Sequence, residues 1–263
     1  MPAELQSTSQ GLTMVLTISN PDNRNALGPE IYAAGIEALN VAESSPEVRS
    51  VIITGASTPS GPAFCAGGDL RRMQANRQQP VEVQQASIEA LHSWIESIRA
   101  FPKPVIAAVE GAAAGAGFSL ALACDFIVAA NNAVFVMAYS NIALSPDGGG
   151  SWSLARALPR QLVTELLMCG SKVDAQRLHA LGVVNRLSAT GSALTDALAW
   201  AEQLNTRAPN ALASCKELVN EAAANTLPQQ LKLERDHFVA NLRHRNAGLG
   251  IEAFLTKTTA KYE

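Results

Sequence analysis

The most apolar stretch of the chain, PVIAAVEGAAAGAGFSLALACDFIVAA at residues 104–130, most constrains the fold. Glu110, Asp125 and several glycines interrupt it, so it does not match the continuous apolar run of a membrane-spanning helix. Its composition instead predicts a strand to Val109, a small-residue loop, a helix from about Ala116 and a second strand. This order of elements is typical of α/β proteins, in which helices cover a sheet.

The same alternation of short strands and helices continues through the first two thirds of the chain. The patterns predict strands within residues 12–21, 48–56, 103–111, 126–130, 133–138 and 182–188. They predict helices within residues 28–45, 81–100, 117–125, 151–158, 161–168 and 174–181, and a loop over 56–70. Four helical patterns follow, within 193–206, 209–224, 228–243 and 250–258. We therefore expect an α/β core over residues 1–195 and a C-terminal helical segment over residues 196–263.

The composition of the chain narrows its function classes. Hydrophobic residues make up 48% and charged residues only 16% of the chain, so we expect part of its surface to be covered by sister subunits. The net charge is -3 and there is no basic run, which argues against a nucleic-acid partner. The N-terminus lacks the pattern of a signal peptide. The four cysteines have no metal-binding spacing, and we expect free thiols in a cytoplasmic protein.

Three loops contain the residues that could bind a ligand or take part in a reaction. In FCAGGDL, residues 64–70, small residues allow a ligand to approach the backbone closely. In EGAAAGAGFSLALACD, residues 110–125, a small-residue loop leads into a helix whose first N–H groups are unpaired and partly positive. In ALSPDGGGSW, residues 143–152, glycines follow Asp147 and leave room around its carboxylate. Two such N–H groups could hold a developing oxyanion while a nearby carboxylate moves a proton.

These loops resemble those of the crotonase family, also called the enoyl-CoA hydratase/isomerase family. The resemblance covers essentially the whole chain and includes NPDNRNAL, FCAGGDL, KPVIAAVEGAAAGAGFSLALACD, FVMAYSNIALSPDGGGSW and GIEAFLTK. It implies a spiral of repeated β-β-α units followed by a C-terminal helical segment used in trimerisation. It also implies an acyl-CoA thioester substrate, a homotrimer or a hexamer made of two trimers, and no membrane association. Coenzyme A would be part of the substrate, and no separate cofactor or metal is expected.

The resemblance also assigns roles to residues of this chain. The backbone N–H groups of Gly68 and Ala116 would hold the thioester oxygen, although the family usually has glycine where Ala116 stands. The CoA group and the acyl chain would contact a set of residues spread over the sequence: Arg24, Ala26, Leu27, Ala66, Asp69, Leu70, Tyr139, Phe254 and Lys257. The last two would contribute to a CoA pocket that could belong to a neighbouring subunit.

The departures from the family pattern indicate the reaction. Hydratases of the family carry two glutamates, at positions where this chain has Ser119 and Tyr139. Asp147 remains, at a position where isomerases of the phenylacetate-pathway type carry an aspartate. Such enzymes use one carboxylate to remove a proton from one carbon and return it to another, or to rearrange a strained ring. We therefore expect an enoyl-CoA isomerase with Asp147 as the acid and base, and inefficient hydration of 2-enoyl-CoA.

Two other functions remain open. In a reaction like that of 4-chlorobenzoyl-CoA dehalogenase, Asp147 would be the nucleophile and His92 would assist hydrolysis. In a non-catalytic acyl-CoA binder, the fold would persist without the reaction. Trp152 is a further candidate, as a wall of the acyl pocket, and Ser119 and Tyr139 could contact the substrate in place of the glutamates.

Overall fold

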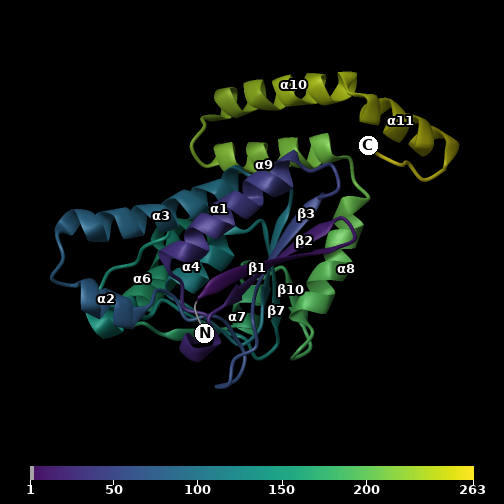
Figure 1. Cartoon of the computed structure of the whole chain (residues 1–263). Coiled ribbons are helices and arrows are strands. Elements are labelled where there is room, and N and C mark those ends of the chain that lie inside the picture. Colours follow the sequence, from purple (N-terminus) through teal and green to yellow (C-terminus); the bar gives the residue numbers. More distant parts are fainter. Residues whose placement is uncertain (1–2) are drawn as a thin grey trace.

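The computed structural model describes residues 3–263, and two sheets form its centre (Figure 1). The larger sheet has the strand order β1-β2-β3-β5-β7-β10, and the smaller sheet has the order β4-β6-β8-β9. The strands are β1 (Glu4–Gln10), β2 (Thr13–Ser19), β3 (Ser50–Gly55), β4 (Ala63–Cys65), β5 (Val105–Val109), β6 (Ala112–Ala114), β7 (Phe126–Ala130), β8 (Val134–Val136), β9 (Lys172–Asp174) and β10 (Arg186–Ser188).

Helices connect and cover the sheets. They are α1 (Pro29–Ser44), α2 (Leu70–Asn76), α3 (Val81–Ala100), α4 (Ala116–Ala123), α5 (Gly150–Ala157), α6 (Arg160–Met168), α7 (Ala175–Ala180), α8 (Ala193–Asn205), α9 (Pro209–Ala222), α10 (Leu227–Arg243) and α11 (Arg245–Thr256). No helix within residues 3–263 combines the length and the apolar composition needed to cross a bilayer.

The chain winds as a spiral through the two sheets. Strands β3, β5 and β7 lie in the larger sheet, and each is followed by a strand of the smaller sheet, β4, β6 or β8, before the next helix. The pairs β3–β5, β5–β7, β4–β6 and β6–β8 are all parallel. This is the predicted α/β spiral of β-β-α units, and the prediction is confirmed.

Side chains that alternate between the two faces of the larger sheet contribute to two separate apolar layers. Val51 and Ile53 belong to the main core, which fills the interior of the spiral. Ile52 and Ile106 face the other way and pack with Ala197 of α8 in a second cluster. Successive side chains of a strand point to opposite faces, so both faces of this sheet must be covered.

The structure corrects the sequence analysis at four strands. The predicted loop over residues 56–70 contains β4, and the loop before α4 contains β6. Both strands, and also β9, are only three residues long, too short for a periodic pattern to reveal. Strand β1 was also missed, because its mostly polar, exposed residues carry no apolar alternation.

The C-terminal helices divide into two groups. Helix α8 packs on the larger sheet through the second cluster. The predicted division after residue 195 falls inside this helix, which begins at Ala193. Helices α9, α10 and α11 then form an arm that extends beyond the core, with α11 at its far end (Figure 1). We use the term C-terminal arm for these three helices.

Candidate active site

Three loops meet at one edge of the smaller sheet. Strands β4, β6 and β8 are parallel neighbours, and the loops 66–69, 115–116 and 137–149 follow their carboxyl ends. The carboxyl ends of parallel strands are where open α/β sheets bind ligands. The β-β-α spiral therefore brings the three sequence motifs together, although up to 80 residues separate them along the chain.

The first two loops are in direct contact. A Cβ atom added to Gly67 would lie 2.8 Å from the carbonyl oxygen of Ala114 and 3.4 Å from the nitrogen of Ala116, and Gly67 has a φ of +94°. Ala116 is the first residue of α4, so its N–H has no partner within the helix. Within residues 3–263, neither this N–H nor that of Gly68 donates a hydrogen bond. Two free backbone donors thus lie on adjoining loops.

A third segment supports the Gly68 loop. The N–H of Leu27 donates to the carbonyl of Gly67 over 2.7 Å, and the N–H of Asp69 donates to the carbonyl of Leu27 over 3.2 Å. The N–H of Ala66 donates to the carbonyl of Arg24 over 3.1 Å. This ladder of backbone hydrogen bonds uses the carbonyl of Gly67 and the N–H of Asp69, on either side of Gly68, and leaves the Gly68 N–H free.

The residues predicted to line the CoA path mostly gather along this ladder. Ala26 and Leu27 are buried, whereas Arg24, Ala66 and Leu70 are exposed. The carboxylate of Asp69 accepts hydrogen bonds from the N–H groups of residues 71 and 72 and so caps the start of α2.

Asp147 is held by side chains from two of the neighbouring elements. The hydroxyl of Tyr139 donates to Oδ1 of Asp147 over 2.6 Å, and the hydroxyl of Ser119 donates to its backbone carbonyl over 3.0 Å. The glycines after Asp147 make this possible: a Cβ on Gly150 would lie 2.5 Å from Oγ of Ser119. The loop is therefore a turn, and it presents a carboxylate in the site.

Tyr139 links the carboxylate to the loop before α4. Its side chain is buried, and a Cβ on Gly115 would lie 3.5 Å from Cζ of the phenol ring. Burial raises the pKa of Tyr139 well above its ordinary value, and the negative charge of Asp147 raises it further. The phenol therefore stays protonated and acts as a hydrogen-bond donor.

Two neighbours of the site were missed by the sequence analysis. Tyr32 of α1 is buried, and its pKa is raised by burial and then by the charge of Asp147. The methyl carbon of Met73 lies 2.3 Å from the Cβ position of Gly68. The cavity beside Gly68, lined in part by these two side chains, has a volume of only about 30 Å³. Tyr32 occurs in an ordinary helical pattern and Met73 in no predicted motif, so the sequence gave no signal of their place near the site.

The structure shows other contacts for the remaining candidates. His92 of α3 is half-exposed and lies 3.8 Å from the carboxylate of Glu89. Trp152 of α5 stacks between Arg99 and Arg156, whose guanidinium carbons lie 4.7 Å and 3.9 Å from its ring centroid. Phe254 and Lys257 are exposed in the C-terminal arm, at the end of α11.

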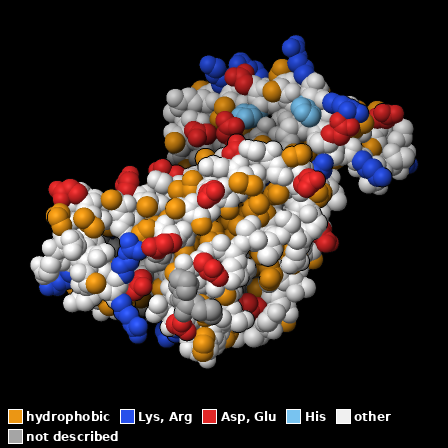
Figure 2. Space-filling model, in the orientation of Figure 1, with side chains coloured by type: hydrophobic (Ala, Val, Ile, Leu, Met, Phe, Trp, Pro, Cys, Tyr) orange, Lys and Arg blue, Asp and Glu red, His pale blue; other side chains and the backbone are white. Residues whose placement is uncertain are grey.

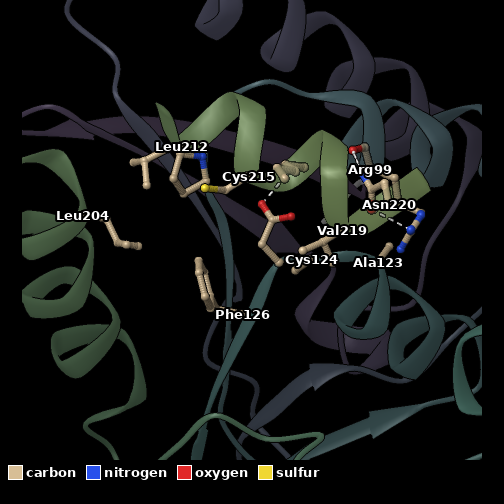
Figure 3. A pocket seen from close by; sticks show the side chains of 12 residues that line it. Arg99, Ala123, Cys124, Phe126, Leu204, Leu212, Cys215, Val219 and Asn220 are labelled. Atoms are coloured by element: carbon tan, nitrogen blue, oxygen red, sulfur yellow. Dashed lines mark hydrogen bonds and ion pairs between the residues drawn. The ribbon is translucent and has the colours of Figure 1, made fainter. Parts of the chain in front are cut away.

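A larger cavity, of about 350 Å³, lies apart from these loops, between α9 and the end of α4 (Figure 3). Cys215 and Val219 of α9 face Cys124 across it, and its walls are mainly apolar. Two of its charged groups pair with each other, Lys216 lying 2.8 Å from Asp125, and Arg99 donates to the side-chain amide oxygen of Asn220 over 2.7 Å. We therefore assign the chemistry to the three-loop site.

The chemical capacity of the three-loop site is to hold an oxyanion and to move a proton. Backbone donors stabilise a developing oxyanion, and Asp147 is a carboxylate positioned beside them. Residues 3–263 contain no cluster of three or more His, Cys, Asp or Glu side chains suited to a metal ion. The arrangement is the one expected of an oxyanion-hole enzyme built on a β-β-α spiral, and the roles of its residues stay predictions.

Comparisons with known proteins identify the family. The family model described as enoyl-CoA hydratase/isomerase matches residues 8–263, and the chain belongs to this family. The crystal structure of an enoyl-CoA hydratase from Polaromonas sp. JS666 is similar, with a TM-score of 0.96, 68% identity, and coverage of 99% of this chain and 100% of that one. The family expected from the sequence motifs is thereby confirmed.

Two curated relatives show the range of reactions in the family. The 1,2-epoxyphenylacetyl-CoA isomerase of Escherichia coli K12 is 34% identical over 250 residues, which cover 95% of this chain and 94% of that protein. The carnitinyl-CoA dehydratase of Citrobacter koseri is 32% identical over 261 residues, which cover 98% of this chain and 97% of that protein. The first is an isomerase of the phenylacetate-pathway type that the sequence motifs resembled.

Proposed function

We propose that the protein is an enoyl-CoA isomerase in which Asp147 is the acid and base. The observation that carries this proposal is the setting of Asp147: the Tyr139 hydroxyl donates to its Oδ1 and the Ser119 hydroxyl to its backbone carbonyl. Among residues 3–263, neither hydroxyl donates to a second carboxylate. A single base suits a reaction that returns its proton, whereas adding water needs one group to activate water and another to protonate carbon.

The proposed steps conserve the proton. The Asp147 carboxylate removes a proton from C2 of a 3-enoyl-CoA, and the C–H electron pair forms an enolate with its negative charge on the thioester oxygen. The N–H groups of Gly68 and Ala116 stabilise that oxygen. The enolate then re-forms the carbonyl, its double bond moves from C3–C4 to C2–C3, and the protonated Asp147 returns the proton to C4.

Similarity to the 1,2-epoxyphenylacetyl-CoA isomerase extends the proposal to a second substrate. In such a substrate the strained epoxide ring, rather than a C3–C4 double bond, would be rearranged next to the thioester. The dehalogenase alternative is less well supported, because the imidazole of His92 lies against Glu89.

Product analysis tests this function. The purified protein is incubated with trans-3-hexenoyl-CoA, trans-2-hexenoyl-CoA, 1,2-epoxyphenylacetyl-CoA and 4-chlorobenzoyl-CoA, and the products are identified by mass spectrometry and NMR. We expect conversion of the 3-enoyl or epoxide substrate, and at least about a 100-fold loss of kcat in Asp147→Asn. Rapid addition of water to the 2-enoyl substrate, or release of chloride, would contradict the proposal. Unchanged turnover by Asp147→Asn would also do so.

We also propose that the C-terminal arm packs against other copies of the chain, in a trimer or a pair of trimers. Leu227, Leu231 and Phe238 of α10 are exposed by 70%, 54% and 69%. Figure 2 shows more hydrophobic side chains gathered on the core face below the arm. Such an assembly would allow Phe254 and Lys257 to reach the site of a neighbour. Light scattering after size-exclusion chromatography would show a trimer or hexamer, and a smaller species for Phe238→Asp.

A further inference from the structure

The Asp147 carboxylate is anchored through only one of its two oxygens. Tyr139 donates to Oδ1 over 2.6 Å, a length typical of a hydroxyl donating to an ionised carboxylate. Within residues 3–263, no hydrogen bond reaches Oδ2. Ser119 fixes the backbone of the same residue by donating to its carbonyl. The side chain is therefore held in one orientation, with one oxygen engaged and the other free.

Tyr139 is suited to hold the carboxylate rather than to exchange protons with substrate. Its ring is 9% exposed and packs over Gly115, the residue before Ala116. Burial and the nearby negative charge both raise the pKa of its phenol, so it is a poor acid at neutral pH. The phenol spans the distance between the loop that carries an oxyanion donor and the loop that carries the base.

We propose that Tyr139 is the positioning residue of Asp147: it fixes Oδ1 and leaves Oδ2 to transfer the proton. This inference rests on the proposed function, because it takes Asp147 as the base. The hydrogen bond prevents rotation of the carboxylate away from the substrate, and catalysis depends on this orientation.

Tyr139→Phe isolates the hydroxyl, because the ring and its packing on Gly115 remain. The measurement is kcat and KM for trans-3-hexenoyl-CoA. We expect kcat to fall about tenfold or more, the effect of losing a hydrogen bond to a charged group. We expect KM to change less than about twofold, since the hydroxyl contacts the base rather than the substrate.

Ser119→Ala is the matched control. Its hydroxyl also bonds to Asp147, but it reaches the backbone carbonyl and not the charged group. We expect a smaller loss of kcat than in Tyr139→Phe. An equal loss in Ser119→Ala would attribute the effect to loosening of the loop and overturn the role of Tyr139. An unchanged kcat in Tyr139→Phe, or a rise in KM alone, would overturn it as well.

Asp147→Asn separates this inference from the proposed function. If Asp147→Asn keeps its turnover, the proposed function fails, and the role of Tyr139 fails with it. If Asp147→Asn is inactive and Tyr139→Phe behaves like the wild type, only the role of Tyr139 fails. Should Tyr139→Phe not fold, 3-fluorotyrosine at position 139 serves instead. This stronger donor should change kcat and leave KM unchanged, and an unchanged kcat would overturn the inference.

Discussion

Gly117 of α4 lies directly against Cys65 at the end of β4. A Cβ atom on Gly117 would lie 2.5 Å from the carbonyl oxygen of Cys65 and 2.7 Å from its Cβ. These are contacts with backbone and with the base of a buried side chain, which cannot rotate away. The spacing between α4 and β4 therefore depends on the absence of a side chain at residue 117, and this spacing sets the relative position of the Gly68 and Ala116 donors.

Gly117→Ala should force α4 away from β4. We expect a loss of about 1–3 kcal/mol in the free energy of unfolding, the usual cost of overpacking a core. We also expect kcat to fall more than a general loss of stability explains, because both N–H donors must face one oxygen. Denaturant titration and steady-state kinetics check the two effects.

Gly248→Ala is the control for this substitution. Gly248 is also helical, but a Cβ there would meet no atom within 4 Å. We expect unchanged or slightly higher stability, since alanine restricts the unfolded chain more than glycine does. If Gly117→Ala had wild-type stability and kcat, α4 could shift without cost. That result would contradict the claim that the spacing between α4 and β4 depends on glycine at residue 117.

Met73 is the residue that closes the site beside Gly68. The adjoining cavity of about 30 Å³ has room for about one water molecule, so an acyl-CoA requires movement of this side chain. In Met73→Ala, we expect kcat/KM to rise several-fold for a branched or aromatic 3-enoyl-CoA relative to trans-3-hexenoyl-CoA, because one methylene in a pocket changes discrimination by about tenfold or more. Competition assays with paired substrates measure the ratio.

Gln74→Ala tests whether this effect belongs to Met73 or to α2 as a whole. Gln74 is the next residue of the same helix, and its side chain is exposed. We expect its substrate ratio to equal that of the wild type. The same ratio in all three proteins would mean that Met73 does not limit the size of the acyl group.

The sequence predicted the fold well where elements are long or strongly apolar. The strands β3, β5 and β7 form buried β-branched or alanine-rich runs, and their pattern could be read directly. Strands β4 and β6 could not be predicted, because their three residues join the sheet only through pairing with each other and with β8. These short strands nevertheless align the loops of the site.

The candidate site was predictable to the level of its loops. Asp147, Gly68 and Ala116 belong to glycine-rich motifs, and the family that those motifs indicated is confirmed. Their catalytic roles remain predictions. The contact of Tyr139 with Asp147 could not be read from the chain, because it depends on how residues 137–149 fold back after β8. The place of Met73 depends in the same way on the packing of α2 over Gly68.

The larger cavity offers a prediction about stability and pH. The Asp125 carboxylate accepts hydrogen bonds from Lys216 and from the N–H of Val105, both over 2.8 Å. Burial raises the pKa of Asp125 above its ordinary value, while the Lys216 charge opposes this rise. A native pKa above the unfolded one means that stability from this group is fully present only below the unfolded pKa. It is lost as pH rises through the folded pKa.

Lys216→Met should therefore destabilise the protein in a pH-dependent way. Removing the ammonium raises the pKa of Asp125 further, so the unpaired charge is costly at pH 7 and is neutralised by protonation at lower pH. We expect a loss of about 3 kcal/mol near pH 7 that shrinks towards about pH 4. Urea titrations at several pH values measure it. In the double variant Asp125→Asn/Lys216→Met, residue 125 no longer has a carboxylate, so the pH dependence of the stability loss should disappear. An equal loss of stability for Lys216→Met at about pH 7 and about pH 4 would instead assign the effect to packing of the lysine side chain.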